Sequence, residues 1–382
     1  MSKKNISTHY AESTSVIKTA QFLAQPEARV HLSGLFGSAF SFVAEAVFNQ
    51  AKLPFLMLFQ DKEEAAYYLN DLEQLIGKQE VLFYPSSYRR PYQIEETDNA
   101  NILLRAEVLN RINSKQKPSI IVSYAEAVFE KVVTKKELDK NTLKVSVNDL
   151  ISIDFINEVL FEYHFKRVDF VSEPGEFSVR GGIVDVFSFS NDLPYRIEFF
   201  GNEVDSIRTF DVETQLSIAT QKKISIIPNV EHQHFQENRE SFLTYIPNKT
   251  VVWIQNAELL GSQLDLLFAK AENEYQKLSK EINRAKPEAL FLNQAAFMKQ
   301  VLDFSIVEFS NKAFFKNPNE VPFFTKPQPS FNKQFQLLLA DLSEKHDDGY
   351  QNFLLCGSEN QANRFHDIFE SLDNESNEDI RK

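Results

Sequence analysis

A glycine-containing turn near the N-terminus has residue types that could bind a phosphate group. The segment LSGLFGSAFSF, residues 32–42, links an apolar run to a helical pattern and contains Gly34, Gly37 and Ser38. A working phosphate loop also needs a lysine that reaches the transferring phosphoryl group. Here Phe40 stands at that position. Because an aromatic ring cannot supply the missing charge, we interpret this segment as a degenerate nucleotide loop.

A second apolar run, VVWIQNAE at residues 251–258, has the form of the strand that carries the acidic magnesium-binding motif of nucleotide hydrolases. It ends in Gln255 and Asn256 instead of a carboxylate pair. Neutral amides are poor ligands for Mg²⁺, which favours carboxylate oxygens. Both halves of the machinery are altered, so we predict no catalytic residues and no nucleotide or metal cofactor for this chain.

A group of arginines and aromatic residues lies in FKRVDFVSEPGEFSVRGGIVDVF, residues 165–187. Arg167 and Arg180 are on either side of a Pro-Gly turn, close in sequence to Phe177 and Phe187. Arginine and aromatic side chains are enriched at the energetic centres of protein interfaces. We therefore predict a protein-docking surface that includes Arg167, Arg180 and Phe177. In the simpler alternative, the arginines are solvated charges and the two phenylalanines belong to the core.

Other candidate groups give weaker signals. His232 and His234 are the closest histidine pair, and nothing at metal-ligand spacing accompanies them. Cys356, the single cysteine, cannot form an intramolecular disulfide and is expected to be a small buried residue. Asp185 and Glu198 have no nucleophile nearby in the sequence, which argues against a pair of catalytic carboxylates.

Composition limits the function classes. The 382 residues include 41 Lys and Arg against 54 Asp and Glu, a formal net charge of −13. An acidic chain is not expected to wrap nucleic acid along its whole length, because phosphate binding uses clustered cations. We find no signal peptide and no apolar run long enough to span a bilayer, so we expect a cytoplasmic protein without a membrane partner.

The order of apolar runs predicts the architecture. Short β-rich runs alternate with helical periods up to residue 128, which is typical of a parallel α/β sheet. Over residues 129–230 strands follow one another without helices, with a hairpin signal at Gly201-Asn202, so we expect a small inserted α+β domain with antiparallel strands. The α/β pattern returns over residues 231–382, where we expect a strand at 350–356 and a polar C-terminal edge.

The inserted region also carries a family resemblance. The segments EPGEFSVRGGIVDVF and YRIEFFGNEVDSIRTFD resemble the signature shared by the nucleotide-excision-repair protein UvrB and the bacterial transcription-repair coupling factors. The Tyr/Pro stretch FYPSSYRRPYQ and the helix LLRAEVLNRI are similar to the same pattern. UvrB keeps an intact phosphate loop, whereas Phe40 and Gln255 here are closer to the coupling factors. The resemblance implies a RecA-like domain, split in sequence and catalytically inactive.

The resemblance further implies what the chain binds. Arg167 and Arg180 match basic residues that contact the damage-recognition protein UvrA, while Ser178 departs from the arginine that UvrB has there. It also implies that RNA polymerase is bound by a further domain, and DNA, ATP and Mg²⁺ by a C-terminal translocase, both outside these 382 residues. The C-terminal part could mask the docking surface within one molecule. Two alternatives remain: an active UvrB-type ATPase that binds damaged DNA, and a structural domain with no partner.

Overall fold

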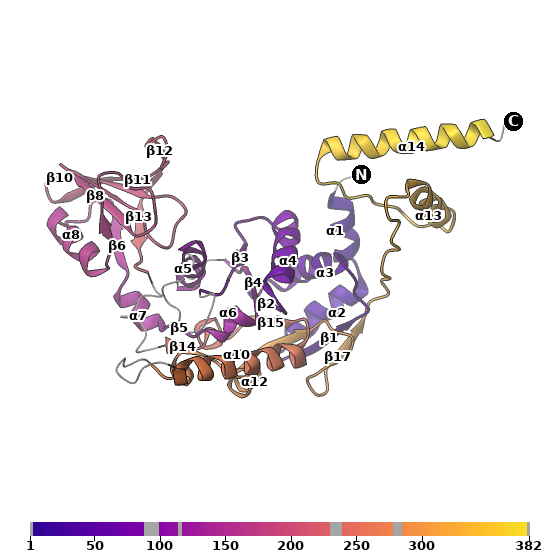
Figure 1. Ribbon diagram of the computed structural model, residues 1–382, viewed down its shortest axis with the longest axis horizontal. Coiled ribbons are helices and arrows are strands. Elements are labelled where there is room, and N and C mark those ends of the chain that lie inside the picture. The colour runs from indigo at the N-terminus through magenta and orange to yellow at the C-terminus, as the bar shows by residue number, and fades with distance from the viewer. Residues whose placement is uncertain (1–2, 88–98, 114–116, 230–238, 278–284, 380–382) are drawn as a thin grey trace. The chain divides into compact units, whose positions relative to one another are not determined.

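The computed structural model describes residues 3–87, 99–113, 117–229, 239–277 and 285–379 (Figure 1). The chain forms two compact units, Met1–Thr325 and Lys326–Lys382. His232, His234 and the end of the Tyr/Pro stretch, on which sequence predictions were made, lie outside the described residues.

A seven-stranded parallel sheet organises the first unit, in the order β17-β1-β16-β15-β2-β4-β3. Three of its strands, β2, β4 and β15, are buried at every position, which is the pattern of parallel strands covered on both faces. The strands of this sheet are β1 (Arg29–Ser33), β2 (Phe55–Phe59), β3 (Val81–Phe83), β4 (Ile120–Tyr124), β15 (Val251–Ile254), β16 (Ser305–Glu308) and β17 (Asn319–Pro322).

Helices cover the two faces of this sheet, with α3 and α4 on one side and α10 and α12 on the other (Figure 1). Asp61 caps α4 by accepting a 2.8 Å hydrogen bond from the backbone N–H of Glu64, as is usual for an aspartate at this position. The helices of this part are α1 (Lys3–Ala11), α2 (Thr14–Leu23), α3 (Ala39–Ala51), α4 (Lys62–Leu75), α5 (Asn99–Asn113), α6 (Ala125–Phe129), α9 (Phe242–Tyr245), α10 (Ala257–Lys277), α11 (Pro287–Leu290) and α12 (Gln294–Val301).

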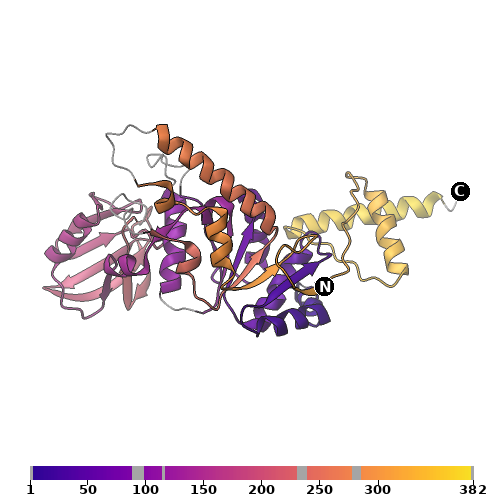
Figure 2. The same cartoon turned by 90° about the horizontal axis from the view of Figure 1, so that it is seen from below.

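A separate six-stranded sheet follows in the order β12-β11-β10-β9-β8-β7, antiparallel except where the edge strand β7 joins β8. Figure 2 shows this sheet in magenta to pink. Gly201, with a φ of 64°, turns the hairpin between β10 and β11. The strands are β7 (Lys166–Arg167), β8 (Glu176–Arg180), β9 (Ile183–Val186), β10 (Tyr195–Phe200), β11 (Glu203–Phe210) and β12 (Ser217–Gln221). The predicted mixed fold, with a parallel sheet and separate antiparallel strands, is confirmed.

Two antiparallel ribbons complete the first unit. β6 (Leu143–Ser146) pairs with β13 (Lys223–Ile226), and β5 (Val132–Val133) pairs with β14 (Arg239–Glu240). Helix α8 (Ile153–Glu162) packs beside the six-stranded sheet through Phe161, whose ring lies 5.2 Å from that of Phe177. A short helix, α7 (Lys135–Lys140), connects β5 to β6.

The second unit differs from its prediction. It contains α13 (Phe335–Asp347) and α14 (Glu359–Asp379), but the expected strand at residues 350–356 has no strand conformation. Leu354 and Leu355 are 46% and 62% exposed, so this run buries too little apolar surface to join a sheet. Strand β17, at the edge of the parallel sheet in the first unit, comes from residues 313–333, a segment rich in Phe and Pro. The proposed boundaries at residues 128 and 230 stay predictions.

Candidate protein-docking site

The six-stranded sheet has a buried carboxylate at the centre of one face. Asp185 of β9 lies opposite Arg196 of β10 and is 1% exposed. Its Oδ1 accepts a 2.7 Å hydrogen bond from Arg196 Nε, and its Oδ2 accepts one of 2.9 Å from Arg196 Nη2. Arg180 Nη2 donates to the same Oδ2 at 2.5 Å. One buried charge thus orients two guanidinium groups on the same face.

Aromatic rings also pack against these two guanidinium groups. The Arg180 group lies 5.0 Å from the ring centroid of Phe170, which is 65% exposed. The Arg196 group lies 4.4 Å from the centroid of Phe210. Hydrogen bonding to Asp185, together with its charge, raises the pKa of Arg196 above its usual value. We call Phe170, Arg180, Asp185 and Arg196 the arginine face.

Arg180 can still contact a partner protein on this face, because its side chain remains 38% exposed while it pairs with Asp185. Arginines held in place lose less conformational freedom on binding than mobile ones. The face therefore offers a fixed cation and an exposed aromatic ring to a partner with carboxylates.

Arg167 lies on the other side of the sheet. The register pairs it with Phe177 of the neighbouring parallel strand, and paired residues point to the same face. Arg180 follows Phe177 by three residues, so alternation places it on the opposite face. Arg167 is exposed and has no side-chain partner within the described part of the chain. The Pro-Gly turn brings the two strands together without joining their arginines into one patch.

Phe177 does not lie on the predicted contact surface. It is completely buried and packs against Phe161 of α8, so a partner cannot touch it in this conformation. Phe187 is 6% exposed and belongs to a small cluster with Val171 and Phe210 under the arginine face. Both rings support the strands that carry the charges.

The aromatic residue of the degenerate nucleotide loop packs into the protein core. Phe40 is 2% exposed and stacks on Phe309 with the ring centroids 4.0 Å apart. Tyr68 and Trp253 approach Phe40 edge-on, at centroid distances of 5.1 and 5.9 Å. The ring at the usual lysine position thus points into an aromatic core below the loop, and Ser38 hydrogen-bonds with Tyr67 at 3.0 Å.

The segment that follows β17 also makes hydrogen bonds with the loop. The backbone N–H of Phe36 donates to Thr325 Oγ1 at 3.0 Å, and that hydroxyl donates to the Gly34 carbonyl at 2.7 Å. At least one amide of the kind that would hold a phosphate is therefore engaged within the chain. At the neighbouring strand end, Gln255 Nε2 donates to Glu64, where a magnesium carboxylate would be expected.

Sequence reasoning missed Asp185 and Phe170 as parts of the site. The sequence presents Asp185 only as a possible catalytic carboxylate, and it gives no signal for Phe170. The alternation of β9 and β10 contains the signal, because it places an acid between two arginines on one face. Among the described residues there is no cluster of three or more potential metal ligands, and no helix long and apolar enough to cross a membrane.

Comparison with known proteins identifies the inserted region. The UvrB interaction domain family matches residues 143–232, which include the whole arginine face. The transcription-repair-coupling factor of Bacillus subtilis is 29% identical over 275 residues, covering 72% of this chain and 23% of that protein. Those of Myxococcus xanthus and Escherichia coli are 28% and 25% identical, each covering 52% of this chain and 17% of the relative.

The matched part thus spans about a quarter or less of each of these relatives. The matches extend beyond the UvrB interaction domain in all three relatives, since the family match covers only residues 143–232. Residues 143–232 therefore match the UvrB interaction domain family, and the chain as a whole is similar to part of the transcription-repair-coupling factors.

Proposed function

We propose that this module docks the damage-recognition protein UvrA and so recruits nucleotide-excision repair to stalled RNA polymerase. The observation that carries the proposal is the position of the arginine face inside the UvrB interaction domain. The name of the relatives, which describes coupling of transcription to repair, supports the same role. The chain itself acts as an adaptor and performs no chemistry.

Binding would use charge and shape. Asp185 holds Arg180 and Arg196 in place, so carboxylates on UvrA can pair with oriented guanidinium groups. Charge complementarity of this kind sets orientation and association rate more than affinity. The exposed ring of Phe170 adds apolar contact area beside Arg180.

The remaining activities belong to the longer protein. We propose that RNA polymerase and DNA are bound, and ATP with Mg²⁺ is used, by parts corresponding to the length of the relatives that this chain does not match. The rival function, a UvrB-type ATPase, would require nucleotide binding at residues 32–42. The internal contacts of Phe40 and Phe36 favour the adaptor over that rival.

Capture of UvrA by single-site variants tests the proposal. We expect Arg180→Ala to weaken capture at least tenfold in a binding titration, because it removes the exposed cation of the arginine face. Asp185→Asn is expected to weaken it as well, since both arginines lose their charged anchor. Arg364→Ala, an exposed arginine of α14, is the matched control and should stay within twofold of the unmodified chain.

Arg167→Ala distinguishes the two faces of the sheet. Full binding by Arg180→Ala together with loss by Arg167→Ala would move the docking site to the face of α8. Undiminished binding by both variants would show that the UvrA site lies elsewhere. Circular dichroism melts of each variant check that the fold is retained.

A further inference from the structure

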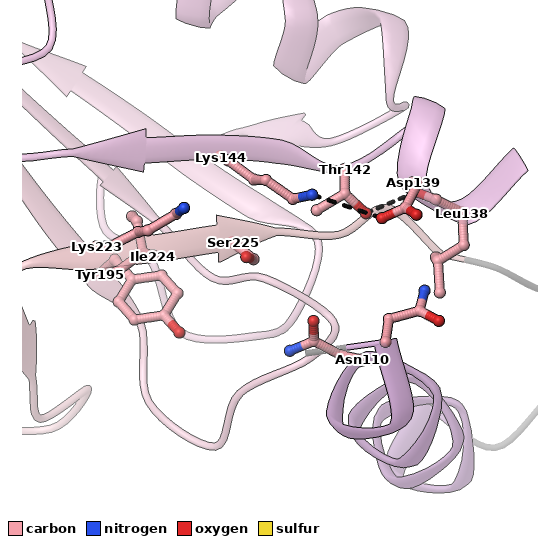
Figure 3. A pocket seen from close by; sticks show the side chains of 10 residues that line it. Asn110, Leu138, Asp139, Thr142, Lys144, Tyr195, Lys223, Ile224 and Ser225 are labelled. Carbon is pink, nitrogen blue, oxygen red and sulfur yellow. Dashed lines mark hydrogen bonds and ion pairs between the residues drawn. The ribbon is translucent and has the colours of Figure 1, made fainter. Parts of the chain in front are cut away.

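A polar cavity of about 520 Å³ lies between α5 and the β6–β13 ribbon (Figure 3). It is separate from the arginine face and from the degenerate nucleotide loop, with which it shares no lining residue. Its volume falls within the roughly 300–1,000 Å³ that is usual for small-molecule sites. Its lining is mostly polar, so its side chains indicate the kind of ligand that fits.

The ribbon supplies one wall with two cations. The register pairs Lys144 with Ser225, and Lys223 with Ser146, so the two lysines lie on the same face of the ribbon. Val145, on the opposite face of the ribbon, is completely buried. Figure 3 shows the lysine side chains and Ser225 on the ribbon side of the cavity.

Helix α5 supplies the facing wall with amides. Asn110 and Asn113 are three residues apart, which places them on one side of the helix, and both line the cavity. Tyr195 lies beside Lys223, and burial raises its pKa to about 12, so its hydroxyl is neutral and able to donate or accept at pH 7. Within the described residues, the side chains of Asn110, Ser225 and Tyr195 have no hydrogen-bond partner.

The local charge is positive although the whole chain carries −13. Asp139 is the acidic residue in the lining, and its Oδ1 lies 3.5 Å from Lys144 Nζ. Both side chains of that pair are more than half exposed, so the pair is weak and a stronger anion can replace it. Lys223 makes no ion pair with any residue that the structure describes.

We propose that this cavity binds a small phosphate ester of mononucleotide size. Lys144 and Lys223 pair with the phosphate, because lysine ammonium groups are strong point-charge partners for phosphate oxygens. Asn110, Ser225 and Tyr195 hydrogen-bond to the remainder of the ligand. This site goes beyond the UvrA-docking role. Its walls come from α5, from α7 and the turn that follows it, and from the UvrB interaction domain, so the ligand would tie these parts together.

Titration with ADP, by calorimetry at low salt, tests the site directly. We expect saturable binding that the double change Lys144→Ala, Lys223→Ala weakens at least tenfold. Both lysines are surface residues of the ribbon, and their truncation removes no core packing. The matched control changes two exposed lysines outside the cavity, Lys18→Ala and Lys62→Ala, and should keep binding within twofold.

Further variants distinguish this cavity from the degenerate loop as the place where ADP binds. Asn110→Leu should also weaken ADP binding, since it removes the amide without removing charge. Binding that survives the double lysine change but is lost in Ser38→Ala would place ADP in the degenerate loop and overturn the proposal. So would the absence of saturable ADP binding, an equal loss in the lysine control, or capture of a single-stranded oligonucleotide without ADP binding. None of these results depends on UvrA, whose capture is measured separately.

Discussion

Glu198 of β10 shows how a single charge on the antiparallel sheet links stability to pH. Its Oε2 accepts a 2.7 Å hydrogen bond from Ser206 Oγ, and its other oxygen pairs with Arg208 across the hairpin. The hydrogen bond from Ser206 lowers the pKa of Glu198 below its usual value, and Arg208 lowers it further. A carboxylate with a depressed pKa stabilises the fold above its unfolded pKa, and this stability is lost as the pH falls through the folded value.

We therefore expect Glu198→Gln to lower the free energy of unfolding by up to about 1 kcal/mol at pH 7, the size of a partly exposed pair. The difference from the unmodified chain should shrink as the pH falls below about 4, where the carboxylate becomes protonated. Urea denaturation at pH 7 and pH 3 measures both values. Glu203→Gln, at the exposed start of β11, is the control. A constant difference at both pH values would contradict the assignment.

At the scale of residues, the sequence predicted which residues could form a site better than it predicted the face of the sheet on which each side chain lies. Arg180 was expected at an interface, and the structure places it on a formed face with Asp185. Phe177 has the same favourable composition but is buried, because alternation along β8 turns it toward α8. Arg167 and Arg180 are close in sequence, yet the register of the short edge strand β7 separates their faces. That register depends on pairing between the two strands and cannot be predicted from either segment alone.

At the scale of elements, the turn after β1 is closed by the segment that follows β17. Gly34 has a φ of +75°, and a Cβ atom built on it would lie 2.1 Å from the Phe323 carbonyl oxygen. Gly37 has a φ of +55°, but nothing lies within 4 Å of its Cβ position. Any residue with a Cβ atom would be strained by the left-handed conformation at either position. Only at Gly34 does the backbone of another segment also lie close to the Cβ position.

These two glycines form a matched pair for mutation. We expect Gly37→Ala to cost about 1–2 kcal/mol of unfolding free energy, the penalty of the left-handed conformation. Gly34→Ala should cost about 1–3 kcal/mol more, because the backbone at Phe323 must move and the Thr325 hydrogen bonds weaken. Chemical denaturation of both variants gives the comparison. Equal losses would mean that the crossing segment does not hold the loop.

The elements that the sequence predicted well are those with strong periodicity. The buried runs of β2, β4 and β15 and the capped helix α4 follow from apolar spacing and from Asp61. Strand β17 did not, because its sequence NEVP contains a proline and few apolar residues. Its position depends on the edge of β1, which offers backbone partners to an extended segment. The cavity beside α5 likewise depends on the meeting of segments distant in sequence.

At the scale of the molecule, the sites described belong to the first unit. The arginine face, the cavity beside α5 and the degenerate loop all lie within Met1–Thr325 and share no residue, although Tyr195 of the cavity and Arg196 of the arginine face are neighbours in β10. This separation allows docking and ligand binding to be altered independently by mutation. We therefore expect the second unit to be dispensable for both, which truncation can measure.

We expect a chain that ends at Thr325 to keep the melting temperature of the first unit within about 2 °C. None of the residues from 326 to 372 is buried, so their removal takes away no core side chain. In the second unit, the described aromatic contacts of Phe365 are with Phe335 and Phe369, and the truncation removes all three residues together. A chain that ends at Pro318 is the control, because it also removes Val321 of β17 and the Thr325 hydrogen bonds. Differential scanning calorimetry should show the chain that ends at Pro318 melting several degrees lower than the chain that ends at Thr325. If both chains melt at the same temperature, β17 contributes nothing to the stability of the parallel sheet. UvrA capture by the chain that ends at Thr325 is a separate measurement, and its loss would show that the second unit takes part in docking.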